Sequence, residues 1–200
     1  SKETFRFNHL KYLQDGNIPL VVFERIVPEI QADCVIIDGK DAAYRATKHM
    51  IDAGRKRIAH FAAPQNLIIG RDRKEGYLEA LREAGIPVDP GLIIEADSFE
   101  RARIAMNDLI DSKNPPDGIF AVNDLTAIGA MQTIQKRGYK IPNDISVVGF
   151  SDGRFSGITE PNLTSVDQHG YEMGTIAAEM LIDRIMNKGV DAAPKTKILQ

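Results

Sequence analysis

The length and composition of the chain fit a globular protein, because 200 residues with 43% hydrophobic content can bury one large core or two small ones. The 25 basic and 28 acidic side chains leave a net charge of −3, which gives this segment no electrostatic basis for binding nucleic acid. Cys34 is the only cysteine, and no apolar run approaches the ~18 residues of a membrane span, which excludes an intrachain disulfide and an integral membrane protein.

Short apolar runs alternate with helical periodicities along the whole chain. The pattern predicts, in chain order, a helix at 5–14, strands at 20–23 and 34–37, a helix ending at 53, a strand at 58–62, an irregular stretch to Gly70, a helix ending near 84, a strand at 92–95, a helix at 99–110, a strand at 118–122, a helix at 125–137, strands at 145–149 and 163–166, and a helix at 171–186. Glycines at 54, 85 and 138 follow the helices, as left-handed stops do. This alternation predicts an α/β fold with layered parallel sheets.

Helix caps and strand tips supply the polar residues of interest. Asn123 and Asp124 follow a buried strand and offer oxygens to cap the next helix, and Asp97, with Glu100 three residues later, is expected to cap the helix at 99–110. Ser151 and Asp152 follow the strand at 145–149. Ligands of parallel sheets bind beyond the carboxyl ends of the strands, so these tips predict a ligand site.

One catalytic signature is present. Gly149-Phe-Ser151-Asp-Gly153 matches the G-x-S-x-G nucleophile elbow and follows a strand, with Asp167 and His169 downstream. The elbow requires a helix at the serine, whereas 154–161 contains Gly and Pro and is expected to be a loop. Aspartate and histidine only two residues apart do not suit a triad, so we favour a protein that is not an enzyme.

Other chemical motifs are missing from the chain. No phosphate-binding glycine loop occurs, and the four histidines lack ligand spacing, so we expect neither a cofactor nor a metal. The basic run at 55–57 could be a nucleic-acid patch, but a solvated turn before a strand is the simpler interpretation.

Several long motifs resemble one family. Residues 116–129 (PDGIFAVNDLTAIG), 137–150 (RGYKIPNDISVVGF) and 161–166 (PNLTSV) resemble the effector-binding core of the lactose-repressor (LacI/GalR) family of bacterial transcription regulators. Residues 18–25, 53–59 and 73–77 follow in the order of the family, so the resemblance covers nearly the whole chain. The helix-turn-helix and the first strands of the family's sensor lie outside it.

The resemblance implies the fold of a type I periplasmic-binding-protein-like domain. Two doubly wound α/β subdomains with parallel sheets would clamp a small molecule between them. We expect residues 1–37 and 168–190 to form part of the amino-terminal subdomain, and residues 38–167 and 191–200 to form the carboxyl-terminal subdomain.

Matching this family also implies a set of ligand contacts. It places at the site Glu24, Arg73, Asp97, Ser98, Asn123, Ser151, Asp152 and Gln168. Ser151 replaces the usual aspartate and Ser98 the usual aromatic residue, and these departures point away from a standard hexose. We expect Arg73→Ala to abolish effector binding while leaving the free protein about as stable.

The predicted function is therefore the sensing of a small polar metabolite, such as a sugar or a derivative, by a cytoplasmic regulator. Operator DNA would be bound by the helix-turn-helix outside this chain. A homodimer would form through Leu125, Ile128 and Met131, although Ile128 and Met131 could instead pack under the sheet. The alternatives are a periplasmic sugar receptor of the same fold and, less favoured, a serine hydrolase.

Overall fold

The computed structural model describes residues 7–24, 26–27, 29–186 and 193–199. The chain divides into two compact units. The smaller unit comprises Ser1–Asp38 and His169–Gln200, and the larger unit comprises Gly39–Gln168. None of the helices within the described ranges is long and apolar enough to cross a membrane.

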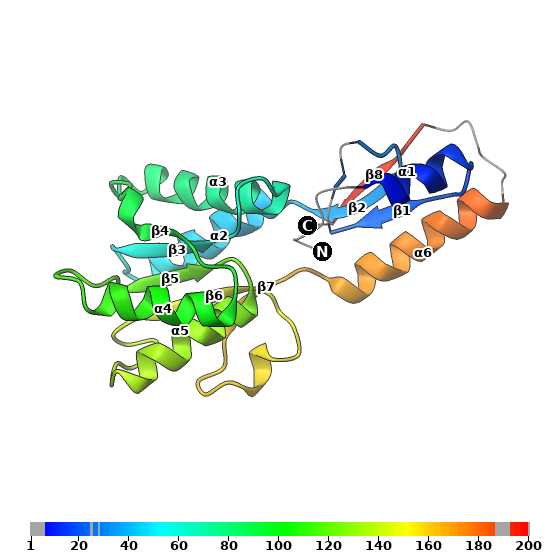
Figure 1. Ribbon diagram of the computed structural model, residues 1–200. Coiled ribbons are helices and arrows are strands. Elements are labelled where there is room, and N and C mark those ends of the chain that lie inside the picture. Colours follow the sequence, from blue (N-terminus) through cyan, green and yellow to red (C-terminus); the bar gives the residue numbers. More distant parts are fainter. Residues whose placement is uncertain (1–6, 25, 28, 187–192, 200) are drawn as a thin grey trace. The chain divides into compact units, whose positions relative to one another are not determined.

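The larger unit is built on a five-stranded parallel sheet (Figure 1). Its strands, in the spatial order β4-β3-β5-β6-β7, are β4 (Ile93–Glu95), β3 (Ile58–Ala62), β5 (Gly118–Ala121), β6 (Ser146–Ser151) and β7 (Thr164–Asp167). All neighbouring pairs are parallel, so their carboxyl ends lie at one edge of the sheet. The strands predicted at 58–62, 92–95, 118–122 and 145–149 therefore share one sheet.

Helices cover both faces of this sheet (Figure 1). One pair is α2 (Gly39–Asp52) with α3 (Ile68–Glu83), and the other is α4 (Phe99–Ile110) with α5 (Asp124–Lys136). Short 3-10 turns lie at Pro90–Leu92 and Ser156–Ile158. The prediction of an irregular stretch to Gly70 is wrong, because α3 already begins at Ile68. A side chain at Gly70 would lie 2.5 Å from the Pro64 carbonyl oxygen, so this glycine permits a close approach within a helix and does not break it.

The smaller unit contains a three-stranded parallel sheet in the order β1-β2-β8, with β1 (Val21–Phe23), β2 (Asp33–Ile37) and β8 (Thr196–Leu199). The helices are α1 (Asn8–Asp15) and α6 (Gly170–Met186), and α6 packs on β1 and β2. The strand predicted at 20–23 therefore lies in a second sheet, and the predicted helix at 171–186 packs on that sheet.

The carboxyl-terminal strand corrects one predicted boundary. Residues 191–200 were expected in the carboxyl-terminal subdomain, but β8 pairs with β2 in the smaller unit. The cause is visible at Asp33, which is 3% exposed: its carboxylate accepts hydrogen bonds from Arg184 Nε (2.8 Å) and from the Lys195 backbone N–H (2.8 Å). These bonds connect α6, the start of β8 and β2, which are distant in sequence.

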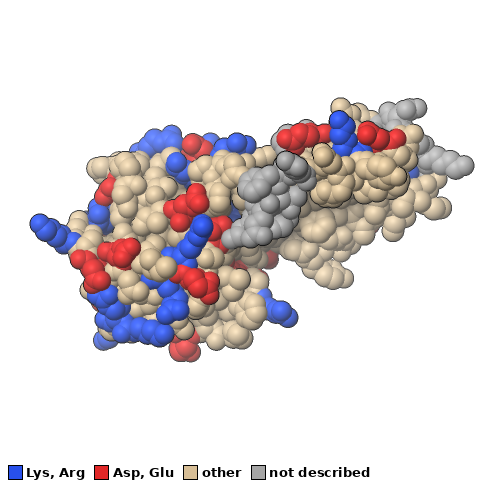
Figure 2. All heavy atoms as spheres, viewed as in Figure 1, with Lys and Arg blue, Asp and Glu red and all other residues tan. Residues whose placement is uncertain are grey.

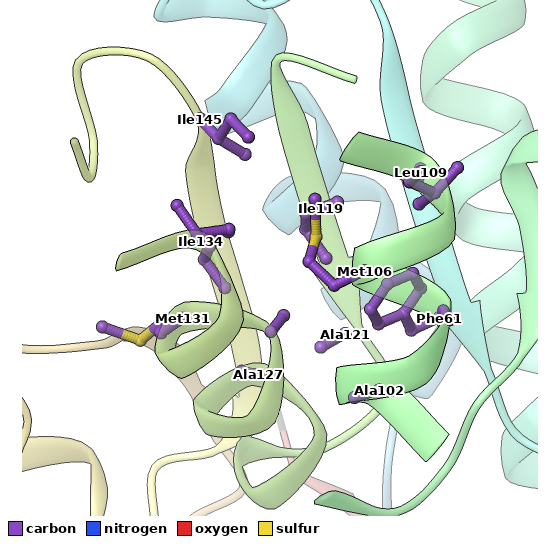
Figure 3. Packing of buried hydrophobic residues seen from close by; sticks show 14 of the residues in the cluster. Phe61, Ala102, Met106, Leu109, Ile119, Ala121, Ala127, Met131, Ile134 and Ile145 are labelled. Atoms are coloured by element: carbon purple, nitrogen blue, oxygen red, sulfur yellow. The ribbon is translucent and has the colours of Figure 1, made fainter. Parts of the chain in front are cut away.

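The core of the larger unit lies mainly between the sheet and α4 and α5 (Figure 3). Phe61 and Ile119 on the strands pack there with Met106 and Ile134 on the helices, and all four are fully buried. Helix α5 fits closely against α4, since a side chain at Gly129 would lie 2.4 Å from the Phe99 carbonyl oxygen. The period-2 alternation of the strands sends the intervening side chains to the opposite face.

The helix boundaries test the predicted caps. Asn123 caps α5, its side chain accepting from the Thr126 N–H at 2.9 Å, which confirms the prediction. Helix α4 is capped by Ser98 and not by Asp97, because Ser98 accepts from the Arg101 N–H. Gly54, Gly85 and Gly138 all have positive φ, as expected of the residues that end α2, α3 and α5.

An unusual histidine lies on the face of the sheet that α3 covers. His60 is fully buried between the rings of Tyr77 (5.2 Å between centroids) and Phe120 (4.9 Å). Its Nδ1 lies 3.1 Å from the Phe120 carbonyl oxygen, whereas its buried Nε2 has no hydrogen-bond partner. Burial lowers the pKa of His60 from 6.5 to about 4, and the nearby positive charge of Arg73 acts in the same direction.

We predict that His60 makes the protein less stable in mild acid. Its pKa is lower in the folded than in the unfolded state, so the unfolded chain binds more protons between pH 6.5 and 4, and stability falls as the pH falls through that window. The loss should total roughly 3 kcal/mol. Urea unfolding at several pH values should show this slope reduced in His60→Leu. His49→Gln, a change of an exposed histidine on α2, should retain it. Identical slopes in wild type and His60→Leu would contradict the assignment.

Candidate functional site

The larger unit gathers most of the predicted ligand residues at the carboxyl ends of its strands. Seven of them belong to this unit: Arg73, Asp97, Ser98, Asn123, Ser151, Asp152 and Gln168. Glu24 follows β1 of the smaller unit and has a φ of +64°.

Arg73 is the centre of this group. Its side chain is only 4% exposed although it carries a permanent charge. Nη1 donates a hydrogen bond to the carbonyl oxygen of Val122, directly after β5. The guanidinium carbon lies 3.6 Å from the centroid of the Phe150 ring on β6, a cation–π contact. Arg73 is therefore fixed against the ends of two adjacent strands.

The motif around Arg73 explains how α3 holds it there. A side chain at Gly76 would lie 2.1 Å from the Lys40 carbonyl oxygen and 2.7 Å from the Tyr44 nitrogen, so only glycine allows α2 and α3 to pack this closely. One residue further, the buried hydroxyl of Tyr77 donates to the Ile58 carbonyl oxygen at 2.8 Å. Because Tyr77 lies four residues after Arg73, both side chains point from the same side of α3 toward the sheet.

A contact between Asn123 and Asp97 connects the segments that follow β5 and β4. The Asn123 side chain caps α5 through its oxygen, and its Nδ2 donates to the Asp97 carbonyl oxygen at 3.3 Å. The Asp97 side chain is buried and lies 3.4 Å from Arg101 Nη1. Asn123 follows Val122, the acceptor of Arg73, so these contacts place Arg73, Asn123 and Asp97 in one connected group.

The segment after β6 is held by Asp124, which was predicted as a helix cap and a strand-tip residue but not in this contact. Asp124 is 7% exposed, and its two carboxylate oxygens accept from the Gly153 N–H (2.8 Å) and the Ser165 hydroxyl (2.5 Å). A side chain at Gly149 would lie 2.5 Å from Asp124 Oδ1. Asp152 Oδ1 accepts from the Ser156 hydroxyl at 2.7 Å, so its carboxylate is used within the loop.

Backbone strain gathers at these loops. Among described residues other than glycine, positive φ occurs at Asn17, Glu24, Ser151, Asp152 and His169. Such conformations cost about 1–3 kcal/mol each and are found preferentially at functional sites. Glu24 directly follows β1, while Ser151 and Asp152 end and follow β6. Gln168 is 9% exposed and precedes His169 at the boundary between the two units.

The glycines of the G-x-S-x-G motif have structural roles. Gly149 leaves room for Asp124, and Gly153 supplies the N–H that Asp124 accepts. Ser151 is followed by a loop and a three-residue 3-10 turn, not by the helix of a nucleophile elbow. These observations support the prediction of a loop at 154–161 and give the motif an explanation other than catalysis.

The predicted dimer residues divide between surface and core. Leu125 is 53% exposed, and Ile128 is half-buried against the core cluster. Met131 is 3% exposed and belongs to that cluster, so its prediction as an interface residue is corrected. The cause is the packing of Met131 within the core cluster, which also contains Ile134 and Leu163.

The basic run at 55–57 organises a turn. Arg55 donates to the carbonyl oxygens of Pro142 and Asn143, and Arg57 pairs with Asp89 at 3.0 Å. Basic and acidic side chains are interspersed over the visible face of the larger unit (Figure 2). These contacts support the simpler interpretation of this run.

The contacts of Phe150 and Asp124 were not predicted from the sequence. Both residues lie inside the motifs that carry the family resemblance, and Asp124 had been singled out as a helix cap and a strand-tip residue. The signal for Asp124 was the pairing of a polar strand tip with glycines at 149 and 153, which leave space and a donor for a carboxylate. No sequence signal places the Phe150 ring against Arg73, because 77 residues separate them.

Comparison with known proteins agrees with this architecture. A family model described as "Periplasmic binding protein-like domain" matches residues 47–200. The HTH-type transcriptional repressor CytR of Escherichia coli K12 is 34% identical over 178 residues, which is 88% of this chain and 52% of that protein. The chain spans about half the length of the curated relatives it matches.

Solved structures show the same fold. A LacI-family regulatory protein from Chloroflexus aggregans superimposes with a TM-score of 0.84 at 33% identity, covering 95% of this chain and 68% of the other. The structure titled "transcriptional regulator CelR-cellobiose complex" has a TM-score of 0.84 at 34% identity and covers 94% of this chain and 57% of the other.

The chain has two α/β units, each built on a parallel sheet, and it belongs to the periplasmic-binding-protein-like family. Its likeness to solved LacI-family regulators, of which it spans more than two thirds, places the chain within the LacI family of transcriptional regulators.

We predict that Asp124 holds the loop after β6. Asp124→Ala should leave the Gly153 N–H and the Ser165 hydroxyl without their acceptor and should lower the free energy of unfolding by about 1–3 kcal/mol. Trypsin should also cleave faster after the exposed Arg154 in this loop. Asp108→Ala, at an exposed position on α4, should change neither the stability nor the cleavage rate by a comparable amount. Equal cleavage rates in wild type and Asp124→Ala would refute the role.

Proposed function

We propose that this segment senses a small, hydroxyl-rich metabolite for a LacI-family regulator, with Arg73 as the principal ligand contact. The observation that carries the proposal is the buried guanidinium of Arg73, held by Val122 and Phe150 at the carboxyl ends of β5 and β6. A planar fork of N–H donors suits ligands with several oxygen acceptors. Family membership and a structural neighbour titled as a cellobiose complex support a sugar or a sugar derivative.

The neighbouring residues suit the same ligand chemistry. Asn123 carries an amide, and Ser98 and Ser151 carry hydroxyls, at or just after the carboxyl ends of β5, β4 and β6. Glu24 of the smaller unit and Gln168 at the unit boundary remain predicted contacts. A ligand that binds one arrangement of the two units more tightly than another would shift their equilibrium and thereby alter operator binding.

The relatives favour a regulator over the alternatives. They are transcriptional regulators and not periplasmic receptors or enzymes, and Gly149 and Gly153 are explained without catalysis. We therefore propose a cytoplasmic protein without catalytic activity, in which a helix-turn-helix elsewhere in the full protein binds operator DNA. A two-fold operator requires a two-fold protein, so we also propose a homodimer.

The ligand prediction is tested in two stages. A thermal-shift screen with cellobiose, D-ribose, glucose 6-phosphate and cytidine should identify at least one compound that raises the melting temperature, because binding to the folded state stabilises it. Arg73→Lys, which keeps the charge but loses the planar fork, should weaken binding of that compound by ~1.5–3 kcal/mol, or roughly ten- to a hundredfold by calorimetry.

Lysine replaces alanine in this test because the structure changes one expectation. Arg73 is buried and in contact with Val122 and Phe150, so Arg73→Ala should destabilise the free protein as well as remove the ligand contact. Arg71→Lys, at an exposed position two residues away, is the matched control and should bind normally. Unchanged affinity in Arg73→Lys would remove Arg73 from the site.

The dimer prediction is tested at Leu125. Leu125→Glu should produce a folded monomer, because a desolvated carboxylate without a partner opposes association by ~2 kcal/mol or more, at least about thirtyfold in the dimer constant. Sedimentation velocity measures the oligomer and circular dichroism the fold. Ile104→Glu changes another exposed residue, 65% exposed on α4, and should leave the oligomer unchanged. A folded Leu125→Glu dimer would exclude Leu125 from the interface.

A further inference from the structure

We propose that Phe150 is the positioning residue that fixes the plane of the Arg73 guanidinium for ligand recognition. This inference rests on the proposed function, in which Arg73 contacts the effector. It assigns a role to an aromatic residue that itself has no exposed surface.

The geometry of the contact carries the inference. The guanidinium carbon of Arg73 lies 3.6 Å from the centroid of the Phe150 ring, which is van der Waals contact between the guanidinium and the face of the ring. A second constraint comes from Nη1, which donates to the Val122 carbonyl oxygen. The Phe150 ring covers one face of the guanidinium, and the Val122 carbonyl oxygen binds one of its edges. The guanidinium therefore has little freedom to rotate.

The Phe150 ring that contacts Arg73 is itself held in a fixed position. Phe150 is 0% exposed, and its backbone pairs with Val166 of β7. Its ring lies 6.5 Å from that of Phe120, which stacks on His60. These aromatic rings come from three strands of one sheet, so their positions are set by the strand register and not by a loop.

The residues that flank Phe150 are constrained in the same way. Gly149 has no space for a side chain beside Asp124, and Ser151 adopts a φ of +123°. Asp124 in turn accepts from Gly153, so the chain on both sides of Phe150 is tied to the start of α5. These contacts hold the backbone around the aromatic ring in place.

A covered guanidinium face restricts how a ligand approaches. Because Phe150 occupies one face of Arg73, the oxygen atoms of a ligand must approach in the plane of the guanidinium or from the opposite face. A fixed plane favours oxygens spaced to match it, such as the vicinal hydroxyls of a sugar, because little rotational freedom is lost on binding. Phe150 thus influences which ligands bind although it touches none of them.

The test separates positioning from mere core stability. Phe150→Leu removes the aromatic face and keeps an apolar side chain, and Phe61→Leu makes the same change in an equally buried residue of the opposite core. In 15N-labelled chain, the side-chain Nε–H signal of Arg73 should show a ring-current shift and slow rotation about its Nε–Cζ bond. Both should disappear in Phe150→Leu and persist in Phe61→Leu.

Affinity is the second measurement, with cellobiose and D-ribose as probes. Phe150→Leu should weaken binding of the responding sugar about two- to thirtyfold, the range of a cation–π contact, whereas Phe61→Leu should bind as wild type does. In the Arg73→Lys background, Phe150→Leu should cause a smaller further loss, because the planar group that it positions is already gone.

The outcomes distinguish the two hypotheses. If neither sugar binds wild type while the Arg73 signal still depends on Phe150, these sugars are excluded as effectors, and positioning of the guanidinium stands. Equal affinity of Phe150→Leu and wild type would overturn the positioning role and leave sugar sensing intact. An Arg73 signal that is unchanged in Phe150→Leu would overturn it even without a ligand.

Discussion

The burial of the Arg73 guanidinium is the constraint on which the larger unit depends. A permanent charge that is 4% exposed must be compensated, and here a carbonyl oxygen at the end of β5 and an aromatic face on β6 both contribute. Neither partner would be in place unless β5 and β6 were adjacent and parallel. The register of the sheet is therefore also the geometry of the candidate site.

The packing of α3, the helix that carries Arg73, constrains the same side chain. Helix α3 must approach α2 closely enough that only glycine fits at position 76, and the Tyr77 hydroxyl anchors the helix to the start of β3. A small shift of α3 would move the guanidinium away from Phe150. Residues that never meet a ligand thus determine whether Arg73 can bind one.

Two polar side chains of the larger unit, those of His60 and Asp124, are buried, and the loss of their hydration opposes folding. His60 lies on the same face as Phe150 and keeps one ring nitrogen without a partner, while Asp124 requires two donors from segments far away in sequence. Removing one such group alone leaves its partners unsatisfied, whereas replacing a whole buried polar network with apolar residues is often neutral or stabilising. The presence of both groups beside the candidate site agrees with a surface shaped for ligand binding.

The sequence by itself determined the α/β class, most strand and helix positions, and the strand tips where polar residues gather, because periodicity and glycine stops are local signals. The motifs at 116–129 and 137–150 also indicated the family and its ligand residues. The start of α3 was missed because Gly70 resembles a helix breaker, whereas its glycine serves a close contact with Pro64.

Only the tertiary structure decided which partners these residues have. Four features join segments that are separated by many residues. They are the contact of the Phe150 ring with Arg73, the contacts of Asp124 with Gly153 and Ser165, the burial of Met131, and the pairing of β8 with β2. No local pattern encodes such distances. They follow from the order of the strands and the packing of the helices, which turn isolated polar residues into a connected site.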